Sequence, residues 1–584
     1  MKHLMIFSIG PVQDFIATAR RSRDLWYGSW MLSELSKAAV NKISELSPPE
    51  DLIFPYTSSA DALKPASNFN APNKIMALID GDPKIVGKEI KAATKKRLGE
   101  LWEDARSYVK GSIDDSLAKS QIDDLLEFYW VSVPYEDNYK TARDKAEEMF
   151  AARKVTRNFN QAVGSSSPKS SLDGSRESVI PKGEYPERKD AEDLKKTKIN
   201  NLYKHYHARR GEQLSGVDLL KRLGDPENSP KFKSTSDIAA IPFIQMLDNR
   251  LGEGQGRKFV ESIKSMLPTD SDKLDGAEEG LAFEGRFIDC FPSQQISDTQ
   301  LKEFNDLFMK TVGDFRPNPY YALIRADGDN MGVVIDEQPD LKTHQSLSRA
   351  LSDFAAQVKG FIKVKEGDGG LFDGVLIYSG GDDVLAYLPL HMALGFAKKI
   401  EESFKIAMGS FKTQDGILPT LSVGIAVSHH LEPLSDALEL AHEAEKAAKS
   451  ISGKNGLAII VSKRSGTERL VKDKFSKLEE RLRKLIQFSE ADAISAGTAY
   501  ELQKLHSTLS DTNIPGVGLA REAMRIVARK REAGSDRDIN TQIKETFEGW
   551  LSPQDNNQAV SLDELALEMI VAKMFTFDSK KEAQ

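Results

Sequence analysis

Apolar runs alternate with amphipathic stretches along the first part of the chain. Continuous apolar runs predict strands over residues 4–9, 74–80 and 127–133. Apolar residues at helical spacing predict helices over residues 12–43 and 139–153. This alternation is typical of an α+β domain, which we expect over residues 1–160.

A second alternation, over residues 311–466, is the clearest pattern in the chain. It predicts strands at 320–326, 375–378, 384–388, 418–427 and 456–461, and helices at 344–364, 391–409 and 434–450. The order strand, helix, two strands, helix, strand is that of a ferredoxin-like domain. We therefore predict an α+β chain in which a duplication relates the two parts.

The remaining segments have a different character. Residues 161–310 predict a linker followed by a helical middle region, and residues 467–584 predict an all-helical C-terminal domain. Residues 151–210 contain 14 Lys and Arg against 7 Asp and Glu, and the serines within 165–171 are typical of a flexible loop. This basic segment is either a solvated linker or a loop that contacts RNA phosphates, and both interpretations stay open.

Composition narrows the class of protein further. The chain has 584 residues, 40% of them hydrophobic and 29% charged, with a net charge of −8, which describes an ordinary globular protein of roughly three to four domains. No apolar run reaches the roughly 18 residues of a membrane span. Cys290 is the single cysteine, which excludes an intrachain disulfide and any multi-cysteine zinc site. We therefore expect a cytoplasmic protein.

Two acidic motifs follow predicted strands of the second domain. Asp327-Gly328-Asp329-Asn330 follows the strand 320–326, and Gly380-Gly381-Asp382-Asp383 forms the tip of a hairpin. Because the first strand and the central hairpin of a ferredoxin-like sheet are neighbours, we expect Asp327 and Asp382 to converge. Clustered carboxylates suit Mg²⁺ or Mn²⁺, which activates a hydroxyl and stabilises charge on a phosphate during nucleotidyl transfer. The glycines leave room for a triphosphate.

These residues also allow other interpretations, namely a calcium loop, a structural turn and lysines that complement a helix end. A calcium loop needs Asp or Asn at its fifth position and Glu at its twelfth, where this chain has Met331 and Gln338. A glycine-rich hairpin is by itself most often only a turn, and its pairing with the Asp327 motif favours function. Lys449 and Lys454 either contact phosphates or simply complement a helix C-terminus. No general base stands out.

The motifs together resemble known families. The two acidic motifs, Ser422-Val423-Gly424-Ile425 and Lys454-Asn455-Gly456 resemble the palm domain of nucleotide cyclases and polymerases, an architecture shared by the GGDEF diguanylate cyclases. The N-terminal residues Ile9-Gly10-Pro11-Val12-Gln13-Asp14-Phe15-Ile16, Asp24-Leu25-Trp26-Tyr27-Gly28-Ser29 and Leu32-Ser33 resemble the large palm-containing subunit of type III CRISPR effector complexes, Cmr (III-B) subtype.

This resemblance implies a first palm domain without the acidic turn, a middle region, a second palm with the turn, and a helical C-terminal domain. It also implies partners, namely other Cmr subunits, crRNA and target RNA, and synthesis of cyclic oligoadenylate from ATP when target RNA binds. The implied metal ligands are Asp327, Gly328, Asp382 and Asp383, of which the three aspartates are catalytic. The implied nucleotide contacts are Ser379, Gly380, Gly381, Lys449 and Lys454.

Several alternatives remain beside this implication. Some relatives without an HD nuclease domain are thought to join AMP from ATP to S-adenosylmethionine through the same site. A non-catalytic scaffold with a vestigial palm and a free-standing diguanylate cyclase are further candidates. The chain has no His-Asp pair, so we expect no HD nuclease activity, and it lacks the cysteines of the family's zinc region, so we expect no structural zinc.

Overall fold

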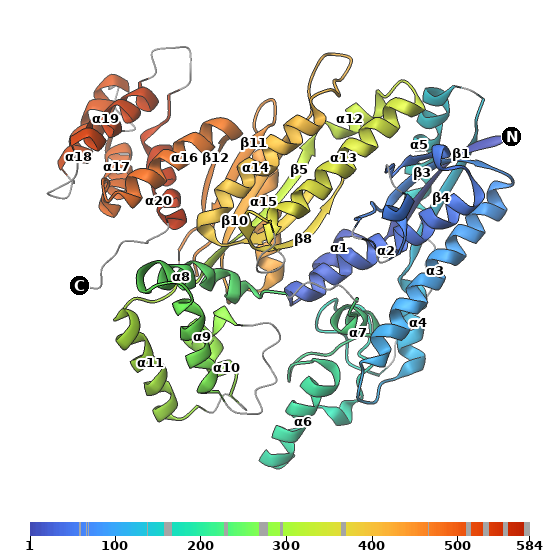
Figure 1. The fold of residues 1–584 in the computed structure, drawn as a ribbon, viewed down its shortest axis with the longest axis horizontal. Helices are drawn as coiled ribbons and strands as arrows, with labels where there is room; N and C mark the ends of the chain where they lie inside the picture. Colours follow the sequence, from blue (N-terminus) through green and yellow to red (C-terminus); the bar gives the residue numbers. More distant parts are fainter. Residues whose placement is uncertain are drawn as a thin grey trace.

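The computed structural model describes residues 1–57, 60–65, 67, 69–136, 138–156, 166–226, 232–267, 278–291, 296–363, 369–464, 466–509, 516–529, 537–552 and 559–576. The chain is an α+β protein, as predicted. Figure 1 shows the first domain in blue on one side, the second domain in yellow and orange at the centre, and the C-terminal helices in red beyond it. No helix in the described ranges is long and apolar enough to cross a membrane.

The first domain is built on a four-stranded sheet with the order β2-β3-β1-β4. The strands are β1 (Lys2–Gly10), β2 (Leu52–Phe54), β3 (Lys74–Asp80) and β4 (Glu127–Pro134), and the helices are α1 (Gln13–Ala17), α2 (Ser22–Leu46), α3 (Pro83–Ser107), α4 (Asp115–Leu125) and α5 (Tyr139–Val155). Successive side chains of a strand face opposite sides of its sheet. Thus Met5 and Phe7 share a core with α2 and α3, whereas Leu4 and Ile6 pack with α5.

The second domain repeats this arrangement and extends it. Its sheet has the order β12-β11-β10-β5-β9-β8, so β10-β5-β9-β8 matches β4-β1-β3-β2. The strands are β5 (Tyr320–Asp329), β8 (Val375–Gly380), β9 (Asp383–Leu388), β10 (Thr420–His429), β11 (Gly456–Val461) and β12 (Arg469–Lys474), and the helices are α12 (Met331–Asp336), α13 (Leu341–Phe361), α14 (Leu390–Met408) and α15 (Leu434–Lys449). A separate two-stranded ladder pairs β6 (Ile362–Lys363) with β7 (Phe372–Asp373).

Opposite faces of this second sheet are covered by different helices. Ala322 and Ile324 of β5 belong to the core that includes α13 and α14, and Leu323 belongs to the core that includes α15. Helix α15 approaches the sheet closely at Gly424, where an added Cβ would lie 2.2 Å from the backbone nitrogen of Glu445. A glycine at this position therefore sets how near α15 lies to β10.

The middle region consists of two groups of helices. Helices α6 (Glu192–Tyr206) and α7 (Gly216–Leu223) share the core of the first domain. Helices α8 (Thr235–Leu251), α9 (Gln255–Ser265), α10 (Glu284–Asp289) and α11 (Asp298–Val312) form a phenylalanine-rich cluster, which also contains the buried Cys290. Short 3₁₀ turns occur at Pro49–Asp51, Ala60–Leu63, Lys182–Glu184 and Glu279–Ala282.

The N-terminal motif anchors α7 against α2. The carboxylate of Asp24 accepts a hydrogen bond from Arg222 Nε at 2.8 Å, and both side chains are buried. Lys221 Nζ donates to the Phe15 carbonyl at 2.9 Å and lies 4.8 Å from the centroid of the Phe15 ring. A buried charge is costly unless it is paired, which explains an aspartate at this position of α2.

The C-terminal helices continue the core of the second domain. They are α16 (Phe475–Glu490), α17 (Ala496–Leu509), α18 (Gly516–Arg529), α19 (Arg537–Leu551) and α20 (Leu562–Phe575). Arg481 of α16 pairs with Glu568 of α20 at 2.7 Å and with Asp473 of β12 at 2.9 Å. These ion pairs attach the helical part of the chain to the last strand of the sheet.

Three expectations about the elements are corrected. The helix expected over 12–43 is two helices, separated at residues 18–21. The purely helical region expected from residue 467 begins with a strand, β12, which lengthens the second sheet. The short strand β2 was missed, because three residues are too few for a periodic pattern.

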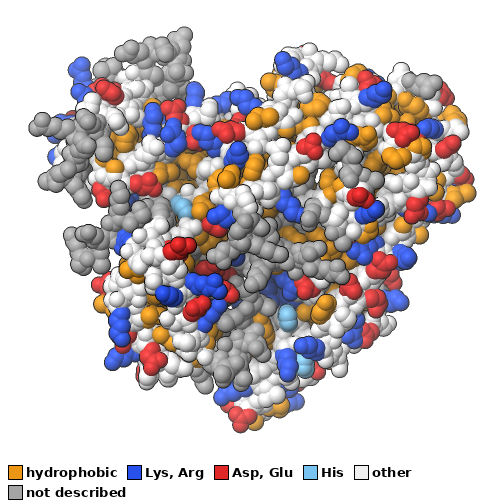
Figure 2. Space-filling model, viewed as in Figure 1, with side chains coloured by type: hydrophobic (Ala, Val, Ile, Leu, Met, Phe, Trp, Pro, Cys, Tyr) orange, Lys and Arg blue, Asp and Glu red, His pale blue; other side chains and the backbone are white. Residues whose placement is uncertain are grey.

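The serine-rich loop and the basic segment are largely folded where the structure describes them. Ser170 is buried and its hydroxyl donates to Asp218 at 2.7 Å, so this serine is not part of a flexible loop. Lys169 pairs with Glu177 at 2.6 Å and Lys198 with Asp190 at 2.9 Å. Figure 2 shows Lys and Arg interspersed with Asp and Glu over the face in view. RNA contact by this segment stays a prediction, and residues 157–165 lie outside the described ranges.

Replacing Gly424 with alanine tests the close approach of α15. Because the added Cβ meets the backbone of α15, we expect Gly424→Ala to lower the free energy of unfolding by about 1–3 kcal/mol. The measurement is the urea midpoint followed by circular dichroism. The matched control is Gly99→Ala in α3, where nothing lies within 4 Å of an added Cβ. Equal midpoints for the two variants would contradict the packing described here.

Candidate functional site

The turn between β8 and β9 has a geometry that only glycine satisfies at two positions. Gly381 has a φ of +66°, in the left-handed region that side chains disfavour. An added Cβ at Gly380 would lie 2.5 Å from the hydroxyl oxygen of Tyr378, which donates to the Gly380 carbonyl at 3.2 Å. The turn therefore presents Asp382 and Asp383 from a fixed backbone.

Asp382 lies directly against the end of β5. An added Cβ at Gly328 would be 2.6 Å from the Oδ2 atom of Asp382. Gly328 is thus the one residue of the Asp327 motif that leaves space for the carboxylate of the turn. The two acidic motifs are thus neighbours, with Asp382 packed against the backbone of the residue that follows Asp327. The convergence of the Asp327 and Asp382 carboxylates on one point stays a prediction.

The two carboxyl groups of the turn are in an environment that disfavours their charge. Burial raises the pKa of Asp382, and the nearby Asp329 raises it further, while backbone hydrogen bonds, including one from Gly328, act in the opposite direction. Burial also raises the pKa of Asp383, as does the neighbouring Asp382, against the opposing effect of Arg325. The pKa values of both carboxyl groups therefore lie above the usual carboxyl range.

Asp327 has its charge balanced within the fold. The Lys449 ammonium at the end of α15 forms an ion pair with Asp327 and lies 3.2 Å from Oε1 of Glu445. Arg325 Nε in turn lies 2.8 Å from Oε2 of Glu445. Burial, followed by the charges of Lys454 and Arg325, lowers the pKa of Lys449 to about 8, while its carboxylate contacts favour the charged form.

Arg325 and Glu445 are site residues that the sequence reasoning missed. Arg325 stands two positions before Asp327 on β5 and therefore faces the same side of the sheet. Glu445 stands four positions before Lys449 on α15, so the two share one face of the helix. Both spacings were visible in the sequence, but only the docking of α15 on β5 and β10 joins them.

Asp329 serves as a structural link. It is fully buried, and its carboxylate accepts hydrogen bonds from Thr420 at 2.7 Å, from Ser422 at 2.8 Å and from the Asn455 backbone at 3.0 Å. These donors come from β10 and from the loop before β11. Asp329, the second aspartate of the motif, thus links the end of β5 to β10 and to the loop before β11.

Two of the predicted nucleotide contacts, Ser379 and Lys454, make hydrogen bonds to other parts of the fold. The Ser379 hydroxyl is buried and donates to the Ala355 carbonyl in α13 at 3.2 Å, so it points into the fold. Lys454 lies in the left-handed turn after α15, with a φ of +50°, and its carbonyl accepts from Lys474 at 2.6 Å. Of the two predicted lysines, Lys449 is therefore the one that the structure pairs with an acidic residue of the site.

A divalent cation needs several oxygen ligands close together. In the part of the chain that the structure describes, no three His, Cys, Asp or Glu side chains form a ready-made metal cluster. The donor set is nevertheless suitable, because Asp327, Asp382 and Asp383 offer only oxygen and two of them have raised pKa values. Hard cations such as Mg²⁺ and Mn²⁺ prefer oxygen ligands, so the chemistry of these side chains suits such an ion, whose binding here stays a prediction.

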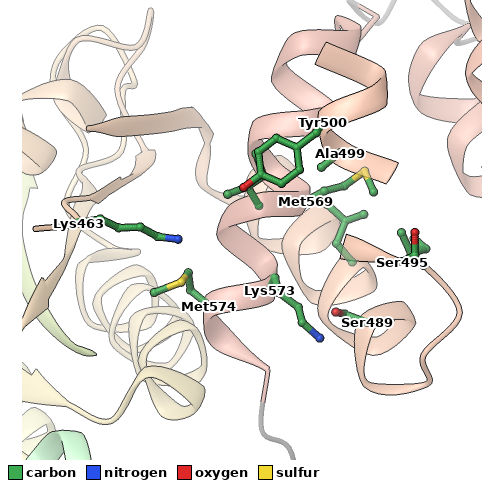
Figure 3. A pocket seen from close by; sticks show the side chains of 11 residues that line it. Lys463, Ser489, Ser495, Ala499, Tyr500, Met569, Lys573 and Met574 are labelled. Carbon is green, nitrogen blue, oxygen red and sulfur yellow. The ribbon is translucent and has the colours of Figure 1, made fainter. Parts of the chain in front are cut away.

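A separate hollow lies in the C-terminal helical part. It has a volume of about 120 Å³ and is lined mainly by α16, α17 and α20, together with Lys463. Figure 3 shows Lys463 directed toward Met574 from the opposite wall. None of its lining residues belongs to the acidic motifs, so it is not part of the candidate site.

Two sheets of one strand order, the second with an acidic turn against its central strand, define a palm-domain protein of the nucleotide cyclase and polymerase type. The comparisons agree with this class. Residues 320–458 match the family model described as Cas10/Cmr2, second palm domain, and residues 4–107 match the model described as CRISPR-associated protein Cmr2, N-terminal. The second domain therefore matches the Cas10/Cmr2 palm and the first domain matches the N-terminal part of Cmr2, which confirms the resemblance that the sequence indicated.

Individual relatives extend the match beyond these two domains. The chain is 26% identical over 562 residues to the CRISPR system Cmr subunit Cmr2 of Pyrococcus furiosus, covering 80% of this chain and 62% of that protein. It thus spans less than two thirds of that relative. Two solved type III-B Cmr-beta structures, an apo state and one bound to cognate target RNA, share the fold with 14% identity each. Both comparisons cover 98% of this chain, with TM-scores of 0.64 and 0.63 and with 81% and 83% of the matched chains.

Replacing Gly328 with alanine tests the contact with Asp382. Because the added Cβ displaces the Asp382 carboxylate, we expect Mn²⁺ binding to weaken by about tenfold or more. Titration calorimetry or electron paramagnetic resonance with Mn²⁺ alone provides the measurement. The matched control is Gly332→Ala, where nothing lies within 4 Å of an added Cβ. Unchanged affinity in the Gly328 variant would exclude this placement of Asp382.

The raised pKa values predict how Mn²⁺ affinity depends on pH. Carboxyls with raised pKa values stay protonated at higher pH than the usual value of about 4, and Mn²⁺ binds the ionised form. The affinity for Mn²⁺ should therefore fall as the pH is lowered from about 8 to about 5. Binding of Mn²⁺ should release protons from these carboxyl groups. Calorimetry in two buffers of different ionisation enthalpy counts them, and Asp383→Asn should reduce the number. A constant affinity between about pH 5 and 8 would contradict the assigned shifts.

Proposed function

We propose that this chain is the nucleotidyltransferase subunit of an RNA-guided type III-B CRISPR complex and makes a cyclic oligoadenylate messenger from ATP. The observation that carries the proposal is the packing of Asp382 against Gly328, beside Asp327, in a palm of the Cas10/Cmr2 type. In the reaction, the 3′-hydroxyl of one ATP attacks the α-phosphate of another. A P–O bond forms to the hydroxyl oxygen, which loses its proton to water, the bond from the α-phosphorus to the bridging oxygen of the β-phosphate breaks, and pyrophosphate leaves with the electron pair.

The acidic residues provide the charge that the reaction needs. Asp327, Asp382, Asp383 and the Gly328 carbonyl would hold Mg²⁺ or Mn²⁺, which when bound offsets phosphate charge and increases the acidity of the attacking hydroxyl. The glycines at 380 and 381 keep side chains away from the turn, so that the triphosphate approaches its backbone.

Lys449 has a second role in this proposal. Its ammonium contacts Asp327 and Glu445. With Asp327 among the residues that would hold the cation, the Lys449 ammonium would be available to contact a phosphate of ATP. Glu445, held by Arg325, keeps the lysine close to the site throughout. Lys454 is a further candidate for a phosphate contact, because its charge already influences Lys449.

The partners in this proposal follow from the family of both palm domains. They are other Cmr subunits, crRNA and target RNA, and binding of the target would start ATP turnover. The same metal site would also serve S-adenosylmethionine as the acceptor of AMP. The described catalytic residues are common to both acceptors, so separation of the reaction products with and without S-adenosylmethionine identifies the acceptor.

Removing the two carboxylates of the turn tests the proposed activity. We expect Asp382→Ala combined with Asp383→Ala to reduce target-RNA-stimulated ATP consumption by at least about a hundredfold, because the charge that stabilises the transition state is lost. The measurement uses the reconstituted complex with cognate target RNA. Asp415→Ala, at an exposed loop position, is the matched control. Full ATP consumption by the double variant would favour a scaffold with a vestigial palm.

A further inference from the structure

The first domain makes a direct contact with the strand that leads into the acidic turn. Asn70 Nδ2 donates a hydrogen bond to the Ser379 carbonyl at 2.9 Å, one residue before Gly380. Helix α2 of the first domain also lies against β8. The backbone of the acidic turn is therefore held partly by a residue outside its own domain.

Asn70 belongs to the connection between β2 and β3 of the first domain. Strands β2 and β3 of the first domain correspond in sheet order to β8 and β9 of the second. In the second domain a tight turn joins the two strands, whereas the first domain has the longer connection 55–73. Asn70 lies on this connection. The first domain thus has, in place of an acidic turn, a segment that contacts the strand leading into the acidic turn of the second.

Residues 69–71, here called the strap, are themselves fixed from behind. The Ser33 hydroxyl accepts a hydrogen bond from the Ala71 nitrogen at 2.8 Å and lies 3.3 Å from the Phe69 carbonyl, to which it donates. Ser33 is on α2 and is buried. It is also the last residue of the N-terminal sequence motif, for which this contact supplies a physical role.

A buried ion-pair cluster on α2 fixes the same connection nearby. Lys37 Nζ donates to the Ser67 carbonyl at 2.9 Å. Lys37 also pairs with Glu34, which pairs with Arg97 at 3.0 Å, and the side chains of Glu34 and Lys37 are only 0% and 1% exposed. These contacts fix Ser67, two residues before the strap, to α2 and so support the connection from which Asn70 extends.

The other side of Ser379 is held by the second domain. Its hydroxyl donates to the Ala355 carbonyl in α13 at 3.2 Å. Helix α13 is in turn attached to the first domain, because Gln345 donates to the Leu52 carbonyl at 2.8 Å and the Ser348 hydroxyl accepts from the Tyr56 nitrogen at 2.8 Å. Ser379 therefore stands between two supports, and Asn70 is the side-chain contact from the first domain.

We propose that Asn70 is a positioning residue, through which the first palm domain sets the place of the Gly380-Gly381-Asp382-Asp383 turn. The inference rests on the proposed function for its effect on catalysis, and on the Asn70–Ser379 hydrogen bond for its effect on structure. Metal-dependent transfer is sensitive to small displacements of its ligands. The first palm thus contributes to the reaction by holding the backbone of the second.

Asn70→Asp tests this role with little change of shape. The variant loses the amide donor and places a carboxylate against the Ser379 carbonyl, so we expect amide hydrogen exchange across residues 375–388 to be about fivefold faster or more. In the assembled complex we expect kcat for ATP to fall about tenfold, with KM changed by less than about twofold. Asn70→Ala should give the same pattern without the added charge.

The matched control is Asn41→Ala, also in the first domain, on α2. It should leave both the exchange rates and turnover as in the unmodified chain. Unchanged exchange at residues 375–388 in both Asn70 variants would overturn the positioning role, whatever the activity. Faster exchange in these variants, combined with no ATP turnover by the unmodified complex, would support the positioning role and reject the proposed function instead.

Discussion

The second domain depends on one constraint. It places several carboxylates close together, at the end of β5 and in the adjacent turn between β8 and β9. Each buried carboxylate has to be neutralised, hydrogen-bonded or protonated. Lys449 pairs with Asp327 and three donors satisfy Asp329, whereas burial raises the pKa values of Asp382 and Asp383. Helix α15 reaches its place through Gly424, so a glycine far from the turn makes the neutralisation of Asp327 possible.

The two palm domains share one strand order but have different roles. The second has the acidic turn between its paired strands, and the first has the connection 55–73 at the corresponding place. That connection, fixed by the buried polar residues of α2, reaches Ser379 through Asn70. In this account the first domain supports the turn of the second through this contact.

Most strands, and the proximity of the acidic turn to the end of β5, were predictable from the sequence, and the reasons for the strands are local. The strand predicted at residues 74–80 coincides with β3, because a continuous apolar run marks a strand buried on both faces. Strand β12, with the sequence Arg469–Lys474, is rich in charge and gives no such signal. The ion-pair chain from Arg325 to Lys449 and the inward direction of the Ser379 hydroxyl depend on contacts between distant segments, which no local pattern specifies.

In the proposed function, the acidic turn supports transfer of a nucleotidyl group. Its most direct test follows ATP labelled separately at the α- and γ-phosphates, in the reconstituted complex with cognate target RNA. The account predicts that the α label enters a phosphodiester product while the γ label leaves in pyrophosphate, and that both events require Asp382 and Asp383. Conversion of ATP to ADP with the γ label in inorganic phosphate, or no conversion at all, would contradict it.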